Sequence, residues 1–337
     1  MIYKNIDFYN VSEFQAAGRE NAYKMLRVPS CVADKISEGG QRMNCANCGV
    51  ELRFNMISDT VKLNLCFDAE GKVTRPVILY GNIPAGWEEC FKNIYYTPTE
   101  IIIKKPSEDS MRLYEKIATE NNHPFDPHVI RVIMQNNHCY FIDITEGIVK
   151  PPTPDQVPKA RYLAYGSSIT HGSLALLQIN TYAYRVAENL GHDLINLGFA
   201  GNARLEKEMA DYIASRDDWD FASLEMGINI LDIPAEEFRE RVTYFIETVA
   251  KTHPSKKVFC IDLFYCKDDL EGGGKASSFR KIVKETVGKL GLPNTVYVNG
   301  LEMLTGSHGL SGDLVHPNVR GAEEISQNLS KLIKSYI

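Results

Sequence analysis

The residues best suited to chemistry lie in the stretch YLAYGSSITHG, residues 162–172. An apolar run ends there in a turn with two adjacent serines, Ser167 and Ser168. A phosphate loop needs four residues between its glycines and then a Lys, whereas five residues separate Gly166 from Gly172 and no Lys follows. The dinucleotide fingerprint GxGxxG is also missing. A plain loop or a nucleophile turn remains, and a nucleophilic serine needs a general base, an orienting acid and donors for an oxyanion.

Partners for such a serine occur in three later loops. DLVHP places Asp313 three residues before His316, a spacing that lets the carboxylate reach the imidazole Nδ1 while Nε2 faces a serine. GFAGNA places the backbone N–H of Gly201 where it could approach an oxyanion, and MGIN supplies the side-chain amide of Asn229. Each feature alone is common in loops, and a His before a helix is more often a capping or surface residue. Their shared position after apolar runs is what gives them weight.

The elements that must position these loops follow a regular alternation after residue 159. Apolar runs alternate with amphipathic segments, which predicts parallel βαβ units and a sheet covered on both faces. The expected strands lie at residues 160–166, 193–200, 220–227, 256–265 and 295–300. The expected helices lie at residues 181–191, 204–216, 234–253, 276–291 and 318–337. We predict a five-stranded, doubly wound sheet with its ligand at the carboxyl ends of the strands.

The first part of the chain has a different pattern. Short, often alternating apolar runs such as GVELRFNMIS, VKLNLCFD and TEIIIKK recur from about residue 25 to residue 148, a rhythm typical of a β-sandwich. KPPTPDQVP holds four prolines in nine residues, which is typical of a stiff linker. We therefore expect an all-β accessory domain over residues 1–150, a linker over 151–158 and a catalytic α/β domain over 159–337.

Composition narrows the range of partners. With 44% apolar residues, 24% charged residues and a net charge of −6, the chain is ordinary for a globular protein and lacks the basic face that nucleic acids need. Neither a signal sequence nor a membrane-spanning run occurs, so we expect a cytoplasmic protein without a membrane partner. The lone CxxC of Cys45 and Cys48 lacks a second ligand pair for zinc, and we expect reduced thiols and no metal.

Four sequence blocks resemble, in order and in placement, those of the SGNH hydrolases, the GDSL-like esterase superfamily. They are Gly166-x-Ser168-x-Thr170-x-Gly172, Gly201, Gly227-x-Asn229 and Asp313-x-x-His316-Pro317. The resemblance covers residues 160 to about 335 and implies a flavodoxin-like three-layer α/β/α domain that hydrolyses esters without a cofactor. It implies that Ser168 is the nucleophile, His316 the base and Asp313 its orienting acid. It implies three oxyanion donors: the backbone N–H groups of Ser168 and Gly201 and the side chain of Asn229.

Two positions depart from the family pattern. Ser167 stands where members commonly carry Asp, and Ile230 stands where a second Asp often follows the Asn. Neither position has a role in the triad, so the chemistry implied by the resemblance survives. The GSSIT form resembles a subgroup in which a β-sandwich, jelly-roll-like domain precedes the hydrolase domain, similar to carbohydrate acetyl esterases.

The resemblance therefore predicts a serine esterase that removes short acyl groups, acetyl first, from an acetylated oligosaccharide. A lipase-like acylhydrolase, an acyltransferase and an inactive carbohydrate-binding protein are the alternatives, and LALLQ, residues 174–178, could wall an apolar acyl pocket. Trp87, an aromatic that could stack on a sugar, and His171, three residues after Ser168, are weaker candidates for substrate contact. An oligomer is left open.

Overall fold

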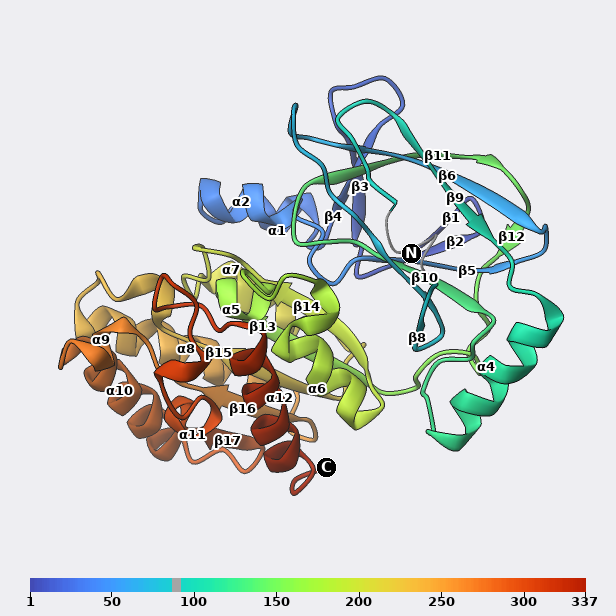
Figure 1. Ribbon diagram of the computed structural model, residues 1–337. Helices are drawn as coiled ribbons and strands as arrows, with labels where there is room; N and C mark the ends of the chain where they lie inside the picture. The colour runs from blue at the N-terminus through green and yellow to red at the C-terminus, as the bar shows by residue number, and fades with distance from the viewer. Residues whose placement is uncertain (87–91) are drawn as a thin grey trace. The chain divides into compact units, whose positions relative to one another are not determined.

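The computed structural model describes residues 1–86 and 92–337, and the contacts within the chain divide it into two compact units (Figure 1). The N-terminal unit comprises Met1–Ser30, Asn44–Lys159 and Gly191–Asp193. The C-terminal unit comprises Cys31–Met43, Ala160–Leu190 and Leu194–Ile337. The segment Cys31–Met43 thus folds with the second half of the sequence, although it is flanked on both sides by residues of the N-terminal unit.

The N-terminal unit is built from two antiparallel sheets. In the first, β1-β2-β5-β10-β7-β8 are neighbours and β12 pairs with β5; in the second, the order is β3-β4-β11-β6-β9. The strands of the first sheet are β1 (Ile2–Tyr3), β2 (Ile6–Tyr9), β5 (Glu51–Met56), β7 (Val77–Tyr80), β8 (Ile83–Pro84), β10 (Val129–Ile133) and β12 (Val149–Lys150). Those of the second are β3 (Glu13–Ala16), β4 (Tyr23–Leu26), β6 (Thr60–Phe67), β9 (Thr99–Lys104) and β11 (Cys139–Glu146).

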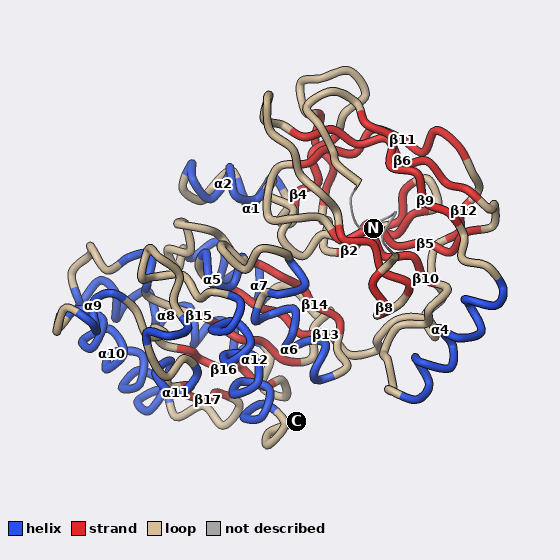
Figure 2. Tube along the Cα trace, in the orientation of Figure 1, coloured by secondary structure: helices blue, strands red, loops and turns tan. Residues whose placement is uncertain are grey.

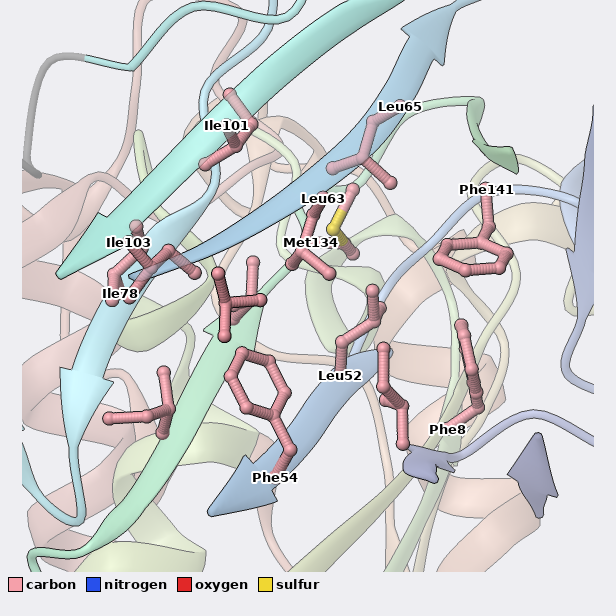
Figure 3. Close-up of a cluster of buried hydrophobic side chains, with 14 of the residues drawn as sticks. Phe8, Leu52, Phe54, Leu63, Leu65, Ile78, Ile101, Ile103, Met134 and Phe141 are labelled. Carbon is pink, nitrogen blue, oxygen red and sulfur yellow. The ribbon is translucent and has the colours of Figure 1, made fainter. Parts of the chain in front are cut away.

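Alternation of side chains explains how these sheets form one core. In β9, Ile101 and Ile103 are buried while Ile102 between them is exposed, as expected of a strand with one face toward the core. Leu63 of β6 pairs with Ile101, and side chains of the other sheet, Leu52 and Phe54, belong to the same buried cluster (Figure 3). The predicted β-sandwich is confirmed.

The C-terminal unit contains the predicted five-stranded parallel sheet, in the order β14-β13-β15-β16-β17. Its strands are β13 (Arg161–Gly166), β14 (Asp193–Gly198), β15 (Phe221–Glu225), β16 (Lys257–Ile261) and β17 (Thr295–Val298). The main helices are α6 (Tyr182–Leu190), α7 (Lys207–Ala214), α8 (Ala235–Thr252), α10 (Lys275–Leu290) and α12 (Val319–Ile333). Since α6 packs on α12 while α8 packs on both α7 and α10, the helices form two groups around the sheet (Figure 1). The doubly wound α/β/α fold is confirmed.

The strand order fixes where a site can form. The chain runs outward from β13 to β14 and then returns to the other side of β13 to make β15, so its direction of travel across the sheet reverses there. In doubly wound sheets, ligands bind at the carboxyl ends of the strands beside such a reversal. The stretch that begins the candidate site, residues 166–172, follows β13 at this point.

Several helices were not foreseen from the sequence. They include α1 (Ser30–Ala33), α2 (Glu38–Asn44) and α4 (Glu108–Glu120), all coloured as helix in Figure 2. The start of α4 has an identifiable signal, since the Ser107 side chain accepts a hydrogen bond from the Ser110 backbone N–H. Across residues 1–86 and 92–337, none of the helices has both the length and the apolar character needed to cross a bilayer.

The CxxC pair lies in a setting that keeps thiols protonated. Cys48 is buried, and this burial raises its pKa to about 12. Burial also raises the pKa of Cys45, with Lys24 and Arg27 opposing the shift. Reactive cysteines usually have a lowered thiol pKa, so this environment does not favour nucleophilic reaction of either thiol.

Candidate active site

The first predicted loop is a tight turn from strand to helix. β13 is buried along most of its length, as expected of a central parallel strand, and α5 (Ser168–His171) follows almost at once. Ser167 caps α5, because its Oγ accepts a hydrogen bond from the backbone N–H of Ile169 at 3.1 Å. Ser168 is therefore the first residue of a one-turn helix, and it is 7% exposed. Its hydroxyl is fixed by the turn without being sealed from solvent.

The three residues predicted to act together are hydrogen-bonded to one another. His316 Nε2 lies 2.6 Å from Ser168 Oγ, and His316 Nδ1 lies 2.6 Å from Asp313 Oδ2. Because a carboxylate can only accept, we assign the proton of the neutral ring to Nδ1, which leaves Nε2 to accept the Ser168 hydroxyl proton. The hydroxyl, the imidazole and the carboxylate thus stand in the order that nucleophilic catalysis requires.

The Asp313 carboxylate is held in its ionised form by its own loop. Burial by itself would raise its pKa, but the backbone N–H groups of His316 and Val315 each donate to Oδ1 at 3.0 Å. Together with the bond from the imidazole, these donors hold the pKa of Asp313 below its usual range. The group is therefore negative at neutral pH and suited to orient the ring.

The loop that carries His316 is closed at its base. The backbone N–H of Ser311 donates to the His316 carbonyl at 2.8 Å, which makes a compact turn. Pro317 follows, and Asn318 then caps α12 through its side chain. Because a residue before proline avoids helical geometry, His316 is kept out of the helix and its ring is free to face the serine.

The three predicted oxyanion donors have no acceptor within the described chain. Gly201 has a left-handed backbone, with φ of 69°, and open space where a Cβ would stand. Asn229 uses its Oδ1 to accept a hydrogen bond from the backbone N–H of Ala203 at 3.1 Å, which turns its Nδ2 away from that contact. Within residues 1–86 and 92–337, neither Asn229 Nδ2 nor the backbone N–H of Ser168 or Gly201 donates to another residue. They are thus available to a ligand.

Hydrogen bonds join the four loops into one site. The backbone N–H of Phe199 donates to the Gly166 carbonyl at 2.8 Å, which ties the second loop to the first. The bond from Ala203 to Asn229 ties the second loop to the third, and the bond between His316 and Ser168 ties the fourth loop to the first. The sequence-predicted residues are therefore brought together at one edge of the sheet.

Comparison of the sequence with models of known protein families gives a match over the part of the chain that carries these four loops. Residues 159–334 match the sequence profile of the GDSL-like Lipase/Acylhydrolase family. The chain belongs to this family. The protein is therefore an enzyme of the ester-hydrolase class, and the resemblance drawn from the four sequence blocks is confirmed. A search of curated proteins found no match.

Solved structures share the fold of this acylhydrolase over most of its length. The salicylyl-acyltransferase SsfX3 from a tetracycline biosynthetic pathway aligns with a TM-score of 0.76 and 17% identity over 98% of this chain and 94% of its own. A family two carbohydrate esterase from Cellvibrio japonicus aligns at 0.60 and 12% identity over 86% and 89%. Another, from Clostridium thermocellum in complex with cellohexaose, aligns at 0.61 and 14% identity over 86% and 93%. At such identities the likeness concerns the fold alone.

One residue of the acylhydrolase site was missed by the sequence reading. Glu225, the last residue of β15, is 1% exposed and lies beneath the first loop. Its Oε2 accepts hydrogen bonds from the Ser167 backbone N–H at 2.6 Å and from Thr170 Oγ1 at 3.1 Å. Its Oε1 has no hydrogen-bond partner among the described residues. The signal was present in the sequence, because a charged residue inside the apolar run DFASLEMG has to be buried with a strand.

The environment of Glu225 shifts its pKa in the opposite direction from that of Asp313. Burial raises the pKa of Glu225, while the hydrogen bonds from Ser167 and Thr170 and the nearby His316 partly offset the shift. A buried carboxyl with a raised pKa lowers stability when it ionises, which is a cost that functional sites often carry. Because Glu225 accepts hydrogen bonds from both Ser167 and Thr170, we assign to it the task of holding the turn that carries Ser168.

The two weaker candidates for substrate contact have different outcomes. His171 is 2% exposed, and its Nδ1 lies 3.0 Å from the Gly198 carbonyl oxygen, so the structure gives no support to contact between its ring and a substrate. Trp87 lies outside the described residues. Contact of either residue with substrate stays a prediction.

Exposed leucines with unusual backbone geometry border the catalytic loops. Leu174 and Leu176, shortly after α5, have φ of 62° and 68° and are 48% and 80% exposed. Leu314, inside the loop that carries His316, has φ of 61°. A branched residue in the left-handed region is strained, and such strain concentrates at functional sites. The predicted apolar wall at residues 174–178 is thus compatible with this exposure.

We predict that Glu225→Gln lowers kcat about tenfold, the equivalent of about 1.4 kcal/mol, because an amide accepts the Ser167 and Thr170 bonds more weakly than a carboxylate. The free energy of unfolding of Glu225→Gln at neutral pH should instead be higher than that of the wild type. The folded-state pKa is raised above the ordinary 4.5, so the wild type is most stable below that value and loses stability as pH rises through the folded pKa. Glu225→Gln has no carboxyl group to ionise at this position, so it should not lose stability in this way as the pH rises.

Urea unfolding of both proteins from about pH 4 to pH 8, together with ester turnover, measures these effects. Glu240→Gln, at an exposed position, is the matched control for loss of a charge. The role assigned to Glu225 would be wrong if Glu225→Gln kept the full kcat. It would also be wrong if this variant lost both activity and stability at neutral pH.

Proposed function

We propose that this acylhydrolase is a serine esterase that removes short acyl groups, acetyl first, from esterified carbohydrate. The observation that carries the proposal is the hydrogen-bonded chain from Ser168 Oγ through the His316 ring to the Asp313 carboxylate. It supports Ser168 as nucleophile, His316 as general base and Asp313 as the group that orients the ring.

The proposed reaction proceeds in two symmetrical halves. Ser168 Oγ attacks the ester carbonyl carbon while its proton passes to His316 Nε2. The tetrahedral intermediate then collapses, the bond to the alcohol oxygen breaks, and the leaving alcohol takes the proton from His316. Water repeats the attack on the acyl-enzyme, releases the carboxylic acid and restores the serine. Asp313 stabilises the imidazolium that forms in each half.

The oxyanion of each intermediate would be bound by three donors. The backbone N–H groups of Ser168 and Gly201 and the Nδ2 group of Asn229 support this role, since none of them donates to another described residue. Preorganised donors of this kind cost no reorganisation during the reaction, and they act where negative charge develops.

The carbohydrate part of the proposal is supported by architecture. A β-sandwich unit and an SGNH-type unit occur in one chain, and two family two carbohydrate esterases align with this chain over 86% of its length. One of those esterases is in complex with cellohexaose. We therefore propose an acetylated oligosaccharide as the substrate class.

Acyl transfer is the second candidate function. The structure of a salicylyl-acyltransferase aligns over 98% of this chain, a larger share than either carbohydrate esterase covers. Transfer would use the same nucleophile, base and oxyanion donors, and would differ only in that an alcohol replaces water in the second half of the reaction. The exposed Leu174 and Leu176 would suit an acyl group larger than acetyl.

We expect Ser168→Ala to reduce hydrolysis of p-nitrophenyl acetate by at least about 10⁴-fold without loss of folding, because the acyl-enzyme can no longer form. Steady-state turnover and thermal unfolding of both proteins provide the measurement. Turnover that survives in the variant would break the nucleophile assignment. A wild type without turnover on any ester would favour the inactive carbohydrate-binding protein.

Asn229→Ala should reduce kcat by about 10²- to 10³-fold with KM little changed, as expected when one oxyanion donor is removed. The side chain also accepts a hydrogen bond from Ala203, so a second variant is needed. Asn229→Asp keeps that acceptor but has no donor, and it should be at least as impaired. Recovery of activity in Asn229→Asp would mean that Asn229 only shapes its loop.

A third prediction concerns the substrate preference of the enzyme. Acetylated xylo- and manno-oligosaccharides should give higher kcat/KM than p-nitrophenyl acetate, and kcat/KM should fall from acetyl to octanoyl p-nitrophenyl esters. Product analysis in the presence of an added alcohol separates hydrolysis from transfer, since transfer yields a new ester. A preference for octanoyl esters would contradict the acetyl assignment and favour the lipase-like alternative.

A further inference from the structure

The segment Cys31–Met43 belongs to the C-terminal unit, although its neighbours in sequence do not. It contains the end of α1 and most of α2. Two adjacent glycines, Gly39 and Gly40, lie in the first turn of α2, where they weaken a helix of only seven residues. Ser37 caps the helix, because its Oγ accepts a hydrogen bond from the Gly40 backbone N–H at 3.2 Å, and a contact elsewhere in the unit adds to this local support.

That contact is with the second catalytic loop. A Cβ placed on Gly39 would overlap Asn202 Oδ1 and would lie 2.6 Å from Asn202 Cγ and 2.9 Å from Asn202 Nδ2. Contacts of this length do not occur between real side chains, so only glycine lets α2 approach Asn202 so closely. Both residues are partly exposed, so the contact adds little to the hydrophobic core.

Asn202 in turn fixes the backbone around Gly201. Its backbone N–H donates to the Phe199 carbonyl at 2.9 Å, and its Nδ2 donates to the Ala200 carbonyl at 2.8 Å. These two bonds close a turn of four residues, within which Gly201 has its left-handed conformation. The direction of the Gly201 N–H therefore depends on where the Asn202 side chain is held.

A second contact from the same segment reaches the far side of this loop. Ser37 Oγ lies 3.3 Å from Glu206 Oε1, and Glu206 Oε2 accepts a hydrogen bond from the Arg204 backbone N–H at 3.2 Å. Between Asn202 and Arg204 lies Ala203, whose N–H binds Asn229. The segment thus contacts the loop on both sides of the residue that orients the Asn229 amide.

We propose that Cys31–Met43 is a positioning element for the oxyanion donors of the esterase. Through Asn202 it sets the direction of the Gly201 N–H, and through Glu206 it steadies the backbone that holds Asn229. This inference rests on the proposed function, since it assumes that these groups bind an oxyanion. It assigns to the first part of the sequence a share in catalysis that the four sequence blocks do not contain.

The test is Gly39→Ala. Alanine favours a helix more than glycine does, so the urea midpoint should stay the same or rise. The added methyl forces Asn202 aside, and kcat should fall about tenfold with KM unchanged, because oxyanion donors act on the transition state. Gly288→Ala, at an open position inside α10, is the control and should keep full activity.

A double-mutant cycle with Asn202→Ala isolates the route. If Gly39 acts through Asn202, adding Gly39→Ala to Asn202→Ala should have no further effect on kcat. Effects that simply multiply, or a Gly39→Ala variant with wild-type kcat, would overturn the inference. Should Gly39→Ala fold poorly, Ser37→Ala removes both the contact with Glu206 and the cap of α2, and it should lower kcat about twofold to threefold. An unchanged kcat would count against the inference.

A measurement independent of turnover keeps this inference separate from the proposed function. Hydrogen exchange of a peptide covering residues 199–206 should be faster in Gly39→Ala than in the wild type, because the turn loses its support. Unchanged exchange would overturn the inference even in an active enzyme. Faster exchange in a protein without esterase activity would support the inference about the loop and reject the proposed function.

Discussion

The hydrogen bond between Ser168 Oγ and His316 Nε2 is the contact on which the rest of this site depends. It joins two residues 148 positions apart, and it can form only because all five strands of the sheet point the same way. In a parallel sheet the carboxyl ends of all strands meet at one edge, so each loop there begins from the same side. The reversal between β14 and β15 then places the second and third loops on either side of the first.

Two carboxylates serve this contact from opposite environments. Asp313 has a side chain that is 41% exposed and a pKa lowered by donors in its own loop, whereas Glu225 is buried and has a raised pKa. The first is suited to orient the His316 ring, and the second accepts the hydrogen bonds that hold the turn carrying Ser168. Glu225 also gives a physical reason for Ser167, because the Ser167 side chain hydrogen-bonds to the Glu225 carboxyl and an Asp there would bring a second negative charge beside it.

Much of this arrangement could be predicted from the sequence. The five parallel strands and their helices follow from apolar runs and amphipathic periods, which are local signals. The loops could be placed at one edge because the topology of such sheets is restricted. Glu225 was missed for a different reason, since a single charge in an apolar strand shows burial but not the partner that it will meet.

The helix α2 could not have been predicted by the same means. Its sequence EGGQRMN has low helix propensity, and the contact that explains Gly39 involves Asn202, far away in the chain. No local pattern contains such information. The domain boundaries at residues 150 and 159 stay a prediction. Boundaries of this kind assume that each domain is one continuous stretch of sequence, whereas Cys31–Met43 folds with residues of the C-terminal unit.

Because Cys31–Met43 folds with the C-terminal unit, the two parts of the sequence cannot be exchanged independently during evolution without loss of contacts. Accessory domains are commonly regarded as modules that recombination can add, remove or exchange. Here an exchange at the proline-rich segment would carry away the serine, the histidine and their partners but leave α2 behind with the old domain. The newly joined hydrolase would keep every motif of its family and lack the helix that its second loop packs against. The two parts of this gene are therefore expected to have diverged together.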